Sequence, residues 1–410
     1  MAGRLPAAQR HSQPPAGPRS RRKPDRPGRG RGRPRPGRVA GSDPDAASVR
    51  VTGWEPRRMP HLRVDHTTSD WVVFAPLRKL RPHAAHGDAN LQGAAKPPDK
   101  GLCPFCPGNE GLTPREIYAV RGQHSGPADW RVRVVPNKFP ALMIEEDQRR
   151  HDEGPLFWQI GGCGAHEVVI ESPEHDTFLG QQPLEQIQLV LETMQQRYRD
   201  LMRDRRFQAF ILFKNHGESA GTSLQHPHWQ LIATPVVPRL LRLKHIEATE
   251  YFDRTGECLY CVLVREELSA EARIVAANEQ FAAFVPYAAH APFETWIVPR
   301  RHEASFHAAP AGQLRSLAEI LRNVLLKLYA GLDDPDFNLT IDLPPRGDED
   351  KAYFLWHVRI LPRLTTPAGF ELGSGMSINT VLPEEAASFL RYGNGQTTLP
   401  ERPVSNAQNA

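Results

Sequence analysis

One unit occurs twice along this chain, and this duplication limits the folds that the chain can adopt. Each copy starts at a C-x-x-C pair, at Cys103 and Cys106 or at Cys258 and Cys261, and continues through a strand pattern, a histidine, a helix pattern and a second strand. Each copy then ends in a strand that carries another histidine. Two such copies predict an α+β fold of two tandem halves, each an antiparallel sheet with a packed helix.

The histidines of the two copies are spaced alike, at 51 residues in the first copy and 55 in the second. Cysteine and histidine are the preferred ligands of Zn²⁺, so we expect two zinc sites, with free buried cysteines as the alternative. The first site comprises Cys103, Cys106, His175 and His226, and the second comprises Cys258, Cys261, His302 and His357. Four protein ligands leave no open position for water, so both sites would be structural.

Apolar patterns locate the elements of each copy. Strands are predicted at 71–76, 166–171, 207–213 and 231–233, and then at 281–285, 293–299, 337–343 and 353–362, and a strand that runs into a turn is predicted over 131–143. Apolar residues at helical spacing predict one helix over 183–202 and another that includes 314–328. We therefore expect a disordered tail (1–50), an N-terminal catalytic half (51–240), a C-terminal half (241–392) and a flexible end (393–410).

The tail differs in composition from the rest of the 410 residues. Residues 1–50 contain 12 Arg and one Lys against three Asp and almost no large apolar side chains, so they cannot build a core. Contact with nucleic acid or another acidic surface, or a transit peptide, are the alternatives to simple disorder. The tail alone carries a formal charge of +10 and the whole chain +4, so the positive charge belongs to the tail and not to the folded body. We therefore do not infer specific nucleic-acid binding from the charge.

The cysteine pattern and the hydrophobic pattern bear on the compartment. Four of the five cysteines lie in the two pairs, and no secretory signal or membrane span is visible. Such usage favours metal ligation over disulfides and a reducing compartment, so we expect a cytoplasmic protein. The fifth, Cys163, is interpreted as a small buried residue.

The stretch that ends in H-P-H-W-Q is where we expect the chemistry. In an extended strand, side chains two residues apart share a face, so His226, His228 and Gln230 would line one side. An imidazole can attack phosphorus, bind a metal or shuttle protons, and an amide can donate to a phosphoryl oxygen. Two surface or core histidines without a catalytic role are the alternative.

With its preceding F-x-N-x-G and serine, this stretch resembles the galactose-1-phosphate uridylyltransferase family, the transferase branch of the histidine-triad superfamily, from about residue 71 to 391. The resemblance implies that His228 attacks the α-phosphorus of a nucleoside-diphosphate sugar and that Gln230 donates to phosphoryl oxygens. It also implies two histidine-triad-like halves, a zinc ion at the first Cys/His group, and substrate contacts from Arg78, Arg81, Asn137, Asn215, Ser223 and Phe370.

The acceptor and the base stay open. Where the galactose enzymes carry K-F-x-V-G-Y-E, this chain carries G-F-E-L-G-S-G at 369–375, which looks more like plant and archaeal relatives that include ADP-glucose phosphorylase. The first hypothesis is UDP-glucose:hexose-1-phosphate uridylyltransferase. The second is ADP-glucose phosphorylase or an adenylyltransferase, and the third is a zinc-stabilised nucleotide- or nucleic-acid-binding module without turnover. A homodimer is an expectation from the family.

Overall fold

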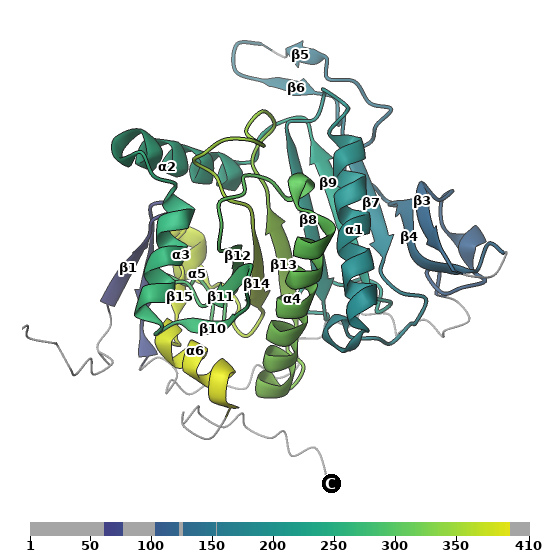
Figure 1. The fold of residues 1–410 in the computed structure, drawn as a ribbon. Coiled ribbons are helices and arrows are strands. Elements are labelled where there is room, and N and C mark those ends of the chain that lie inside the picture. Colours follow the sequence, from purple (N-terminus) through teal and green to yellow (C-terminus); the bar gives the residue numbers. More distant parts are fainter. Residues whose placement is uncertain (1–60, 77–102, 123–125, 153, 394–410) are drawn as a thin grey trace, which may run out of the picture. The chain divides into compact units, whose positions relative to one another are not determined.

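A ten-stranded antiparallel sheet organises the described part of the chain. The structure is a computed structural model and describes residues 61–76, 103–122, 126–152 and 154–393. The strand order is β10-β11-β12-β14-β13-β8-β9-β7-β4-β3, and every pairing in the sheet is antiparallel (Figure 1). The α+β class predicted from the sequence is confirmed.

The sheet consists of two halves with the same strand order, read from each outer edge inward. The first half is β3 (Tyr118–Arg121), β4 (Trp130–Pro136), β7 (Ala165–Ile170), β9 (His228–Thr234) and β8 (Ala209–His216). The second half is β10 (Ile274–Ala277), β11 (Phe281–Phe284), β12 (Thr295–Pro299), β14 (His357–Pro362) and β13 (Phe337–Asp342). The halves join where β8 pairs with β13, so the duplication seen in the sequence is a duplication of structure.

One helix from each half covers the same face of the sheet. The helices are α1 (Leu184–Leu201) and α4 (Ala311–Leu332), and they pack side by side, as Figure 1 shows. Both were predicted, although Pro183 is the N-cap of α1 and not part of its first turn. Alternate strand residues such as Leu212, Leu231 and Ile360 point to these helices and form the main core. The strands therefore turn their intervening residues to the other face.

That other face is covered differently in the two halves. In the second half, α2 (Arg239–Thr255) and α3 (Leu259–Ala270) pack over it, and Ala282 and Phe284 form a separate apolar cluster with them. Neither helix was predicted from the sequence. In the first half, the face carries the loop of Cys103 and Phe105 near β7, and half-buried residues along β8 and β9. We call this first-half surface, opposite α1, the open face.

The smaller elements lie around the main sheet. A three-stranded sheet is formed by β1 (His61–Asp65), β2 (Asp70–Phe74) and β15 (Ile378–Asn379). A hairpin of β5 (Arg150–Asp152) and β6 (Trp158–Ile160) projects from the first half (Figure 1). The short helices are α5 (Gly369–Ser374), α6 (Pro383–Tyr392) and the 3-10 turns Glu110–Leu112, Leu179–Gln181 and Phe306–Ala308.

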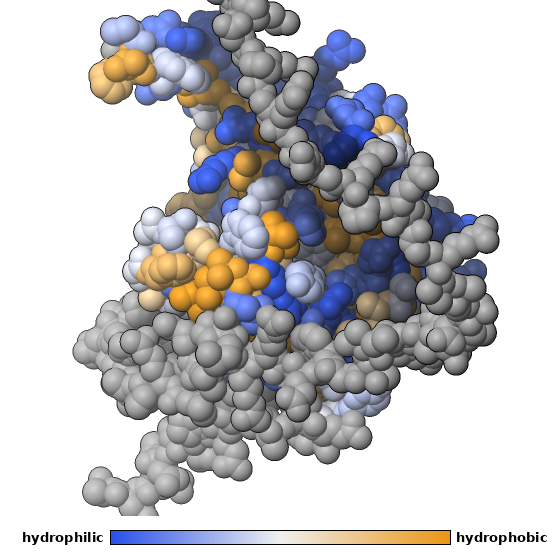
Figure 2. All heavy atoms as spheres, turned by 90° about the vertical axis from the view of Figure 1, so that its left-hand side faces the viewer, coloured by the Kyte–Doolittle hydropathy of each residue, from blue (hydrophilic) through white to orange (hydrophobic). Residues whose placement is uncertain are grey.

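The surface on the side of β1 and α3 carries both apolar and hydrophilic residues. Seen from that side, apolar patches alternate with hydrophilic ones (Figure 2). Among the described residues, no helix is long and apolar enough to span a membrane.

Candidate active site and metal groups

The first Cys/His group lies at the end of β7 on the open face. Its four ligand atoms are within 4.8 Å of one another, and the group comprises Cys103, Cys106, His175 and His226. The Sγ atom of Cys106 lies 3.2 Å from His175 Nδ1 and 3.6 Å from His226 Nδ1, and Cys103 Sγ lies 3.8 Å from His226 Nδ1. The structure thus brings together all four residues that the sequence predicted.

This geometry fits a tetrahedral metal ion. Metal–ligand distances of about 2.0–2.3 Å place neighbouring ligand atoms of a tetrahedron roughly 3.3–3.8 Å apart. The Nε2–H of His226 donates to the carbonyl oxygen of Ser172 at 2.8 Å, so its Nδ1 lone pair faces the two sulfur atoms. His226 is fully buried and Cys103 is fully buried, whereas His175 is nearly so. A metal here would fix the turn that leads into β9.

His228 is the first residue of β9 and points to the open face. Its Nδ1–H donates to the carbonyl oxygen of His226 at 2.8 Å, which leaves the lone pair on Nε2. Burial lowers the pKa of His228 to about 4, the bond to His226 opposes this shift, and the charge of Lys214 adds to it. His228 is therefore a neutral imidazole near pH 7 with its Nε2 lone pair available.

Gln230 lies two residues further along β9, on the same face as His228. Its Oε1 is 2.8 Å from Nε2 of His166 on the neighbouring strand β7. The backbone N–H of Ala141 donates to the Nδ1 of His166, so in the neutral ring the proton sits on Nε2 and is donated to Gln230. The amide nitrogen of Gln230 makes no hydrogen bond among the described residues. The Nδ2 of Asn137, which follows β4, lies 3.1 Å from the same Nε2, but both atoms carry hydrogen in this tautomer and form no hydrogen bond with each other.

The other predicted substrate residues lie on different elements. Asn215 lies on β8 and pairs with Asn338 of β13, while Ser223 is exposed in the loop between β8 and β9. Phe370 is 48% exposed on α5, where its carbonyl oxygen accepts from Ser374 Oγ within the helix. Arg78 and Arg81 lie outside the described residues.

A buried ion pair that the sequence analysis missed supports β9 from behind. Lys214 of β8 donates to Glu171 Oε2 at 3.0 Å and approaches the carbonyl oxygen of His228 at 3.5 Å. The side chains of Lys214 and Glu171 are 2% and 0% exposed, and Gln182 donates to the other oxygen of Glu171 at 3.1 Å. A lysine inside the apolar run F-I-L-F-K-N was the signal that could have revealed this pair.

The second Cys/His group contains only three of the four residues that the sequence predicted. Cys258, Cys261 and His302 have ligand atoms within 4.8 Å of one another, and Cys261 Sγ lies 3.3 Å from His302 Nδ1. His357 is not in this group. Its Nδ1–H donates to the carbonyl oxygen of Leu355 at 3.1 Å and its Nε2 lies 3.2 Å from Asp342 Oδ2. Both ring nitrogens thus face other partners.

Cys258 has features that suit a metal ligand. It is the N-cap residue of α3, and contacts with Cys261 and with His302 lower the pKa of its thiol although burial opposes this. A thiolate is the form that binds a metal. Three protein ligands leave one position of a tetrahedron for another donor.

Buried charges fill the face of the second half that corresponds to the open face. Lys244 of α2 forms an ion pair with Asp342 of β13 and lies over the ring of Trp296. Burial would raise the pKa of Asp342, but the charges of Lys244 and Arg359 hold it well below its usual range. The side chain of His357 is fully buried between Trp296 and Tyr260. This half therefore has no comparable open surface beside His357 among its described residues.

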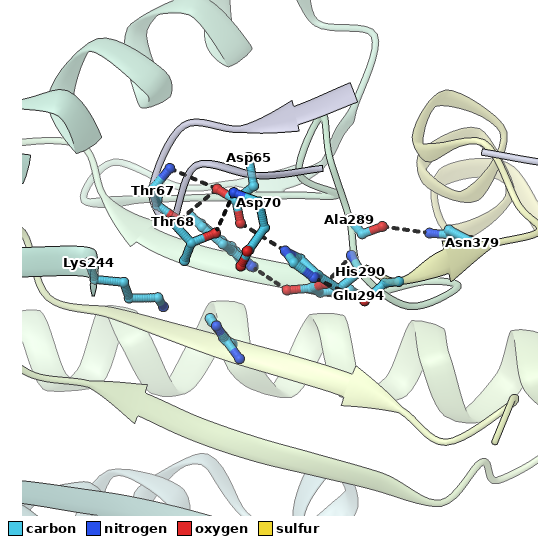
Figure 3. A network of polar contacts seen from close by, with 12 residues as sticks. Asp65, Thr67, Thr68, Asp70, Lys244, Ala289, His290, Glu294 and Asn379 are labelled. Carbon is cyan, nitrogen blue, oxygen red and sulfur yellow. Dashed lines mark hydrogen bonds and ion pairs between the residues drawn. The ribbon is translucent and has the colours of Figure 1, made fainter. Parts of the chain in front are cut away.

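A second set of polar contacts ties β1 and β2 to this region. Asp65 accepts from His290 Nε2 at 2.9 Å and from the backbone and hydroxyl of Thr67, as Figure 3 shows. Glu294 accepts from the backbone of His290 at 2.7 Å, and Asn379 donates to the carbonyl oxygen of Ala289. The polar groups of this network are hydrogen-bonded to one another.

Comparisons with known proteins place these features in a family. A model of the N-terminal domain of galactose-1-phosphate uridyl transferase matches residues 52–238, and a model of its C-terminal domain matches residues 244–391. The chain therefore belongs to the galactose-1-phosphate uridyl transferase family, as the motif around His228 predicted. The prediction of an enzyme of this nucleotidyltransferase family is confirmed at that level.

Individual relatives differ in their activity. The chain is 33% identical over 336 residues to an ADP-glucose phosphorylase from Arabidopsis thaliana, covering 81% of this chain and 92% of the relative. It is 29% identical over 342 residues to a galactose-1-phosphate uridylyltransferase from Thermotoga maritima, covering 81% and 98%.

Solved structures share the fold over the same extent. The crystal structure of an ADP-glucose phosphorylase from Arabidopsis thaliana with bound ADP-glucose matches with a TM-score of 0.69 and 31% identity, covering 82% of this chain and 99% of that chain. The structure of a uridylyltransferase matches with a TM-score of 0.63 and 27% identity, covering 82% and 98%.

Proposed function

We propose that this protein transfers a nucleoside monophosphate from a nucleoside-diphosphate glucose to a second phosphate, with His228 as the nucleophile. One observation carries the proposal. The Nδ1 of His228 is committed to the carbonyl oxygen of His226, so the Nε2 lone pair stands on the open face beside the amide of Gln230. A nucleophilic lone pair next to a neutral donor is what attack on a phosphoryl group requires.

The first half-reaction forms a bond from Nε2 of His228 to the α-phosphorus. The bond between that phosphorus and the bridging oxygen breaks, and glucose 1-phosphate leaves with the electron pair. No proton needs to move, because Nδ1 keeps its proton and glucose 1-phosphate is a stable anion. The positive charge that the ring acquires is stabilised by the carbonyl oxygen of His226, 2.8 Å from Nδ1.

The second half-reaction reverses these steps with another phosphate. An oxygen of the acceptor attacks the phosphorus, and the bond to Nε2 breaks. Positioning and charge neutralisation supply most of the catalysis in such transfers. Gln230 would donate to the phosphoryl oxygens, and the remaining substrate contacts would come from Arg78, Arg81, Asn137, Asn215, Ser223 and, at the sugar, Phe370.

The donor and the acceptor define two candidates. The first moves UMP from UDP-glucose to a hexose 1-phosphate such as galactose 1-phosphate, in line with the family model and the Thermotoga maritima relative. The second moves AMP from ADP-glucose to inorganic phosphate, and the 33% identical Arabidopsis thaliana relative favours it. Both use the same atoms of His228, so the covalent chemistry is common to them.

Zinc ions would support the site and take no step in the reaction. Cys103, Cys106, His175 and His226 would hold one ion, which would anchor the turn before His228. Cys258, Cys261 and His302 would hold a second. A homodimer and a soluble cytoplasmic location belong to the same proposal.

Trapping the covalent intermediate tests the proposal. The purified protein is incubated without acceptor with UDP-glucose or ADP-glucose labelled at the α-phosphorus and is then denatured in alkali, which preserves a phosphoramidate. Label from one donor that is absent in His228→Ala identifies the nucleophile and the base. Binding of both donors without any retained label would favour a zinc-stabilised binding module and contradict the transfer.

A further inference from the structure

An asparagine of the second half contacts two parts of the first half's open face. Asn338 lies on β13 and is paired with Asn215 of β8. Its Nδ2 donates to the carbonyl oxygen of Ala220 at 2.9 Å and to Oδ1 of Asn215 at 2.9 Å. The sequence motif around His228 includes Asn215 but not Asn338, which lies more than 100 residues further along the chain.

The orientation of both amides follows from these contacts. The carbonyl oxygen of Ala220 can only accept, so Asn338 must turn its nitrogen and not its oxygen toward it. The second hydrogen on that nitrogen then points to Asn215, which has to present Oδ1. The Nδ2 of Asn215 is consequently turned away from Asn338.

The nitrogen of Asn215 is placed to meet a ligand beside His228. Phe213 pairs with Gln230, so Asn215, two residues on, is level with His228, two residues back on the antiparallel strand. Asn215 is only half-buried, and within the described residues its Nδ2 makes no hydrogen bond. A Cβ on Gly221 would lie 3.9 Å from this nitrogen, so the loop passes close to it without a side chain.

We propose that Asn338 is a positioning residue that fixes the amide of Asn215 as a hydrogen-bond donor toward the ligand. The inference rests on the proposed function and adds to it the kind of group that binds at this point. A fixed donor next to the nucleophile selects a group that only accepts hydrogen bonds, which a phosphoryl group does. Asn338 itself is not a catalytic residue, because Asn215 lies between it and the open face.

A neighbouring aspartate offers a matched control. Asp336 accepts from the backbone N–H of Ser219 at 2.7 Å and from its hydroxyl at 2.6 Å, so it holds the same loop as Asn338. Among the described residues, it makes no hydrogen bond to the side chain of Asn215. Asp336→Ala should loosen the loop without reversing the amide of Asn215.

The test is Asn338→Asp, which keeps the shape of the side chain and removes its donors. The carboxylate would attract the nitrogen of Asn215, so Oδ1 would face the ligand. Calorimetry on the full chain measures the dissociation constants of UDP-glucose and ADP-glucose, and competition measures those of uridine and adenosine. We expect roughly tenfold weaker binding of the nucleotide sugar by Asn338→Asp, with nucleoside binding unchanged.

The added negative charge is separated from the amide effect by a double-mutant cycle. In an Asn215→Ala background, Asn338→Asp should weaken binding by less than about twofold, because the group through which it acts is gone. An equal loss in both backgrounds, or the same phosphate-selective loss in Asp336→Ala, would overturn the inference. A different outcome would separate the two proposals. If the nucleotide sugar binds tightly and the double-mutant cycle gives the expected result, but no covalent label forms, the transfer chemistry is overturned and the inference on Asn338 stands.

Discussion

His228 and His357 hold their rings in the same way in the two halves of the sheet. Each is the first residue of its strand, β9 or β14, and each donates from Nδ1 to the carbonyl oxygen two residues earlier, at 2.8 Å and 3.1 Å. In front of Nε2, however, His228 has the open face and His357 has the carboxylate of Asp342. The duplication has thus kept the ring geometry in both halves and the open face in one.

The two histidines should respond oppositely to replacement by alanine. His228→Ala should abolish covalent labelling with little loss of stability, because its ring faces the site. His357→Ala should keep the labelling reaction but lower the free energy of unfolding by about 2–4 kcal/mol, because it leaves a cavity and removes a partner of Asp342. Labelling stoichiometry and denaturant unfolding measure the two effects. More than one label per chain would show that the second half also reacts.

The metal groups predict which cysteines carry metal. Cys103→Ser should remove about one zinc ion per chain and lower the melting temperature. Its effect on labelling should be smaller than its effect on these two quantities. Cys258→Ser should remove a second ion from the three-residue group. Cys163 is fully buried and outside both groups, so Cys163→Ala is the control and should keep the metal content of the natural chain. Atomic absorption on the purified variants measures the content, and full zinc occupancy in Cys103→Ser would contradict the first site.

The sequence predicted the parts of the fold that periodic apolar patterns determine. The repeated C-x-x-C and histidine spacing predicted two halves. The helix over 184–201 was expected at nearly these bounds, and the helix over 311–332 contains the apolar residues 314–328 that predicted it. The helix over 239–255 was not, because its apolar face is narrow and only Lys244 and Ala248 are buried. Unlike Lys214, Lys244 stands among other polar residues and not in an apolar run, so its burial against Asp342 of a distant strand left no sequence signal.

The spacing of the histidines was misleading for the second metal group. His357 matched His226 by distance along the chain, but in the sheet it corresponds to His228, and Leu355 stands where His226 stands. A difference of two residues preserves the face of a strand, so alternation could not distinguish the two positions. The pairing of Asn338 with Asn215 was equally hidden, because it depends on how the two halves join.

The contact between Asp65 and His290 predicts how stability depends on pH. Burial would raise the pKa of Asp65, but the contacts with His290 and Thr67 lower it to about 2. A depressed carboxyl pKa stabilises the fold above about pH 4, and this contribution is lost as the pH falls through 2. Burial and the charge of Arg359 lower the pKa of His290. The contacts with Asp65 and the charge of Glu294 outweigh them, so the pKa is raised overall.

His290 therefore stabilises the fold fully below pH 6.5 and loses this contribution as the pH rises through its raised pKa. Asp65→Asn should lower the free energy of unfolding at pH 5–6 by about 2 kcal/mol and flatten the dependence in both ranges. Urea unfolding from pH 2 to 9 measures this. An unchanged pH profile in Asp65→Asn would show that the pair does not titrate with folding.

The buried pair of Lys214 and Glu171 predicts a coupling between stability and the position of His228. Replacing one partner leaves an uncompensated buried charge, so Lys214→Met or Glu171→Gln should each cost about 3 kcal/mol. The double variant should recover part of this loss, because both charges are then gone. The exposed pair of Arg265 and Glu257 is the control, because solvent screens its charges and breaking it should change the stability little.

The same pair should also affect the reaction, because Lys214 approaches the carbonyl oxygen of His228 at 3.5 Å. In the stable double variant, the backbone at His228 loses this contact while the ring keeps its bond to His226. We expect the rate of labelling to fall by roughly tenfold with little change in the affinity for the nucleotide sugar, since the altered atom lies behind the nucleophile and not at the ligand. Single-turnover labelling against donor concentration separates the two quantities. A loss confined to affinity would mean that Lys214 acts on the ligand through the field of its charge and not through the position of His228.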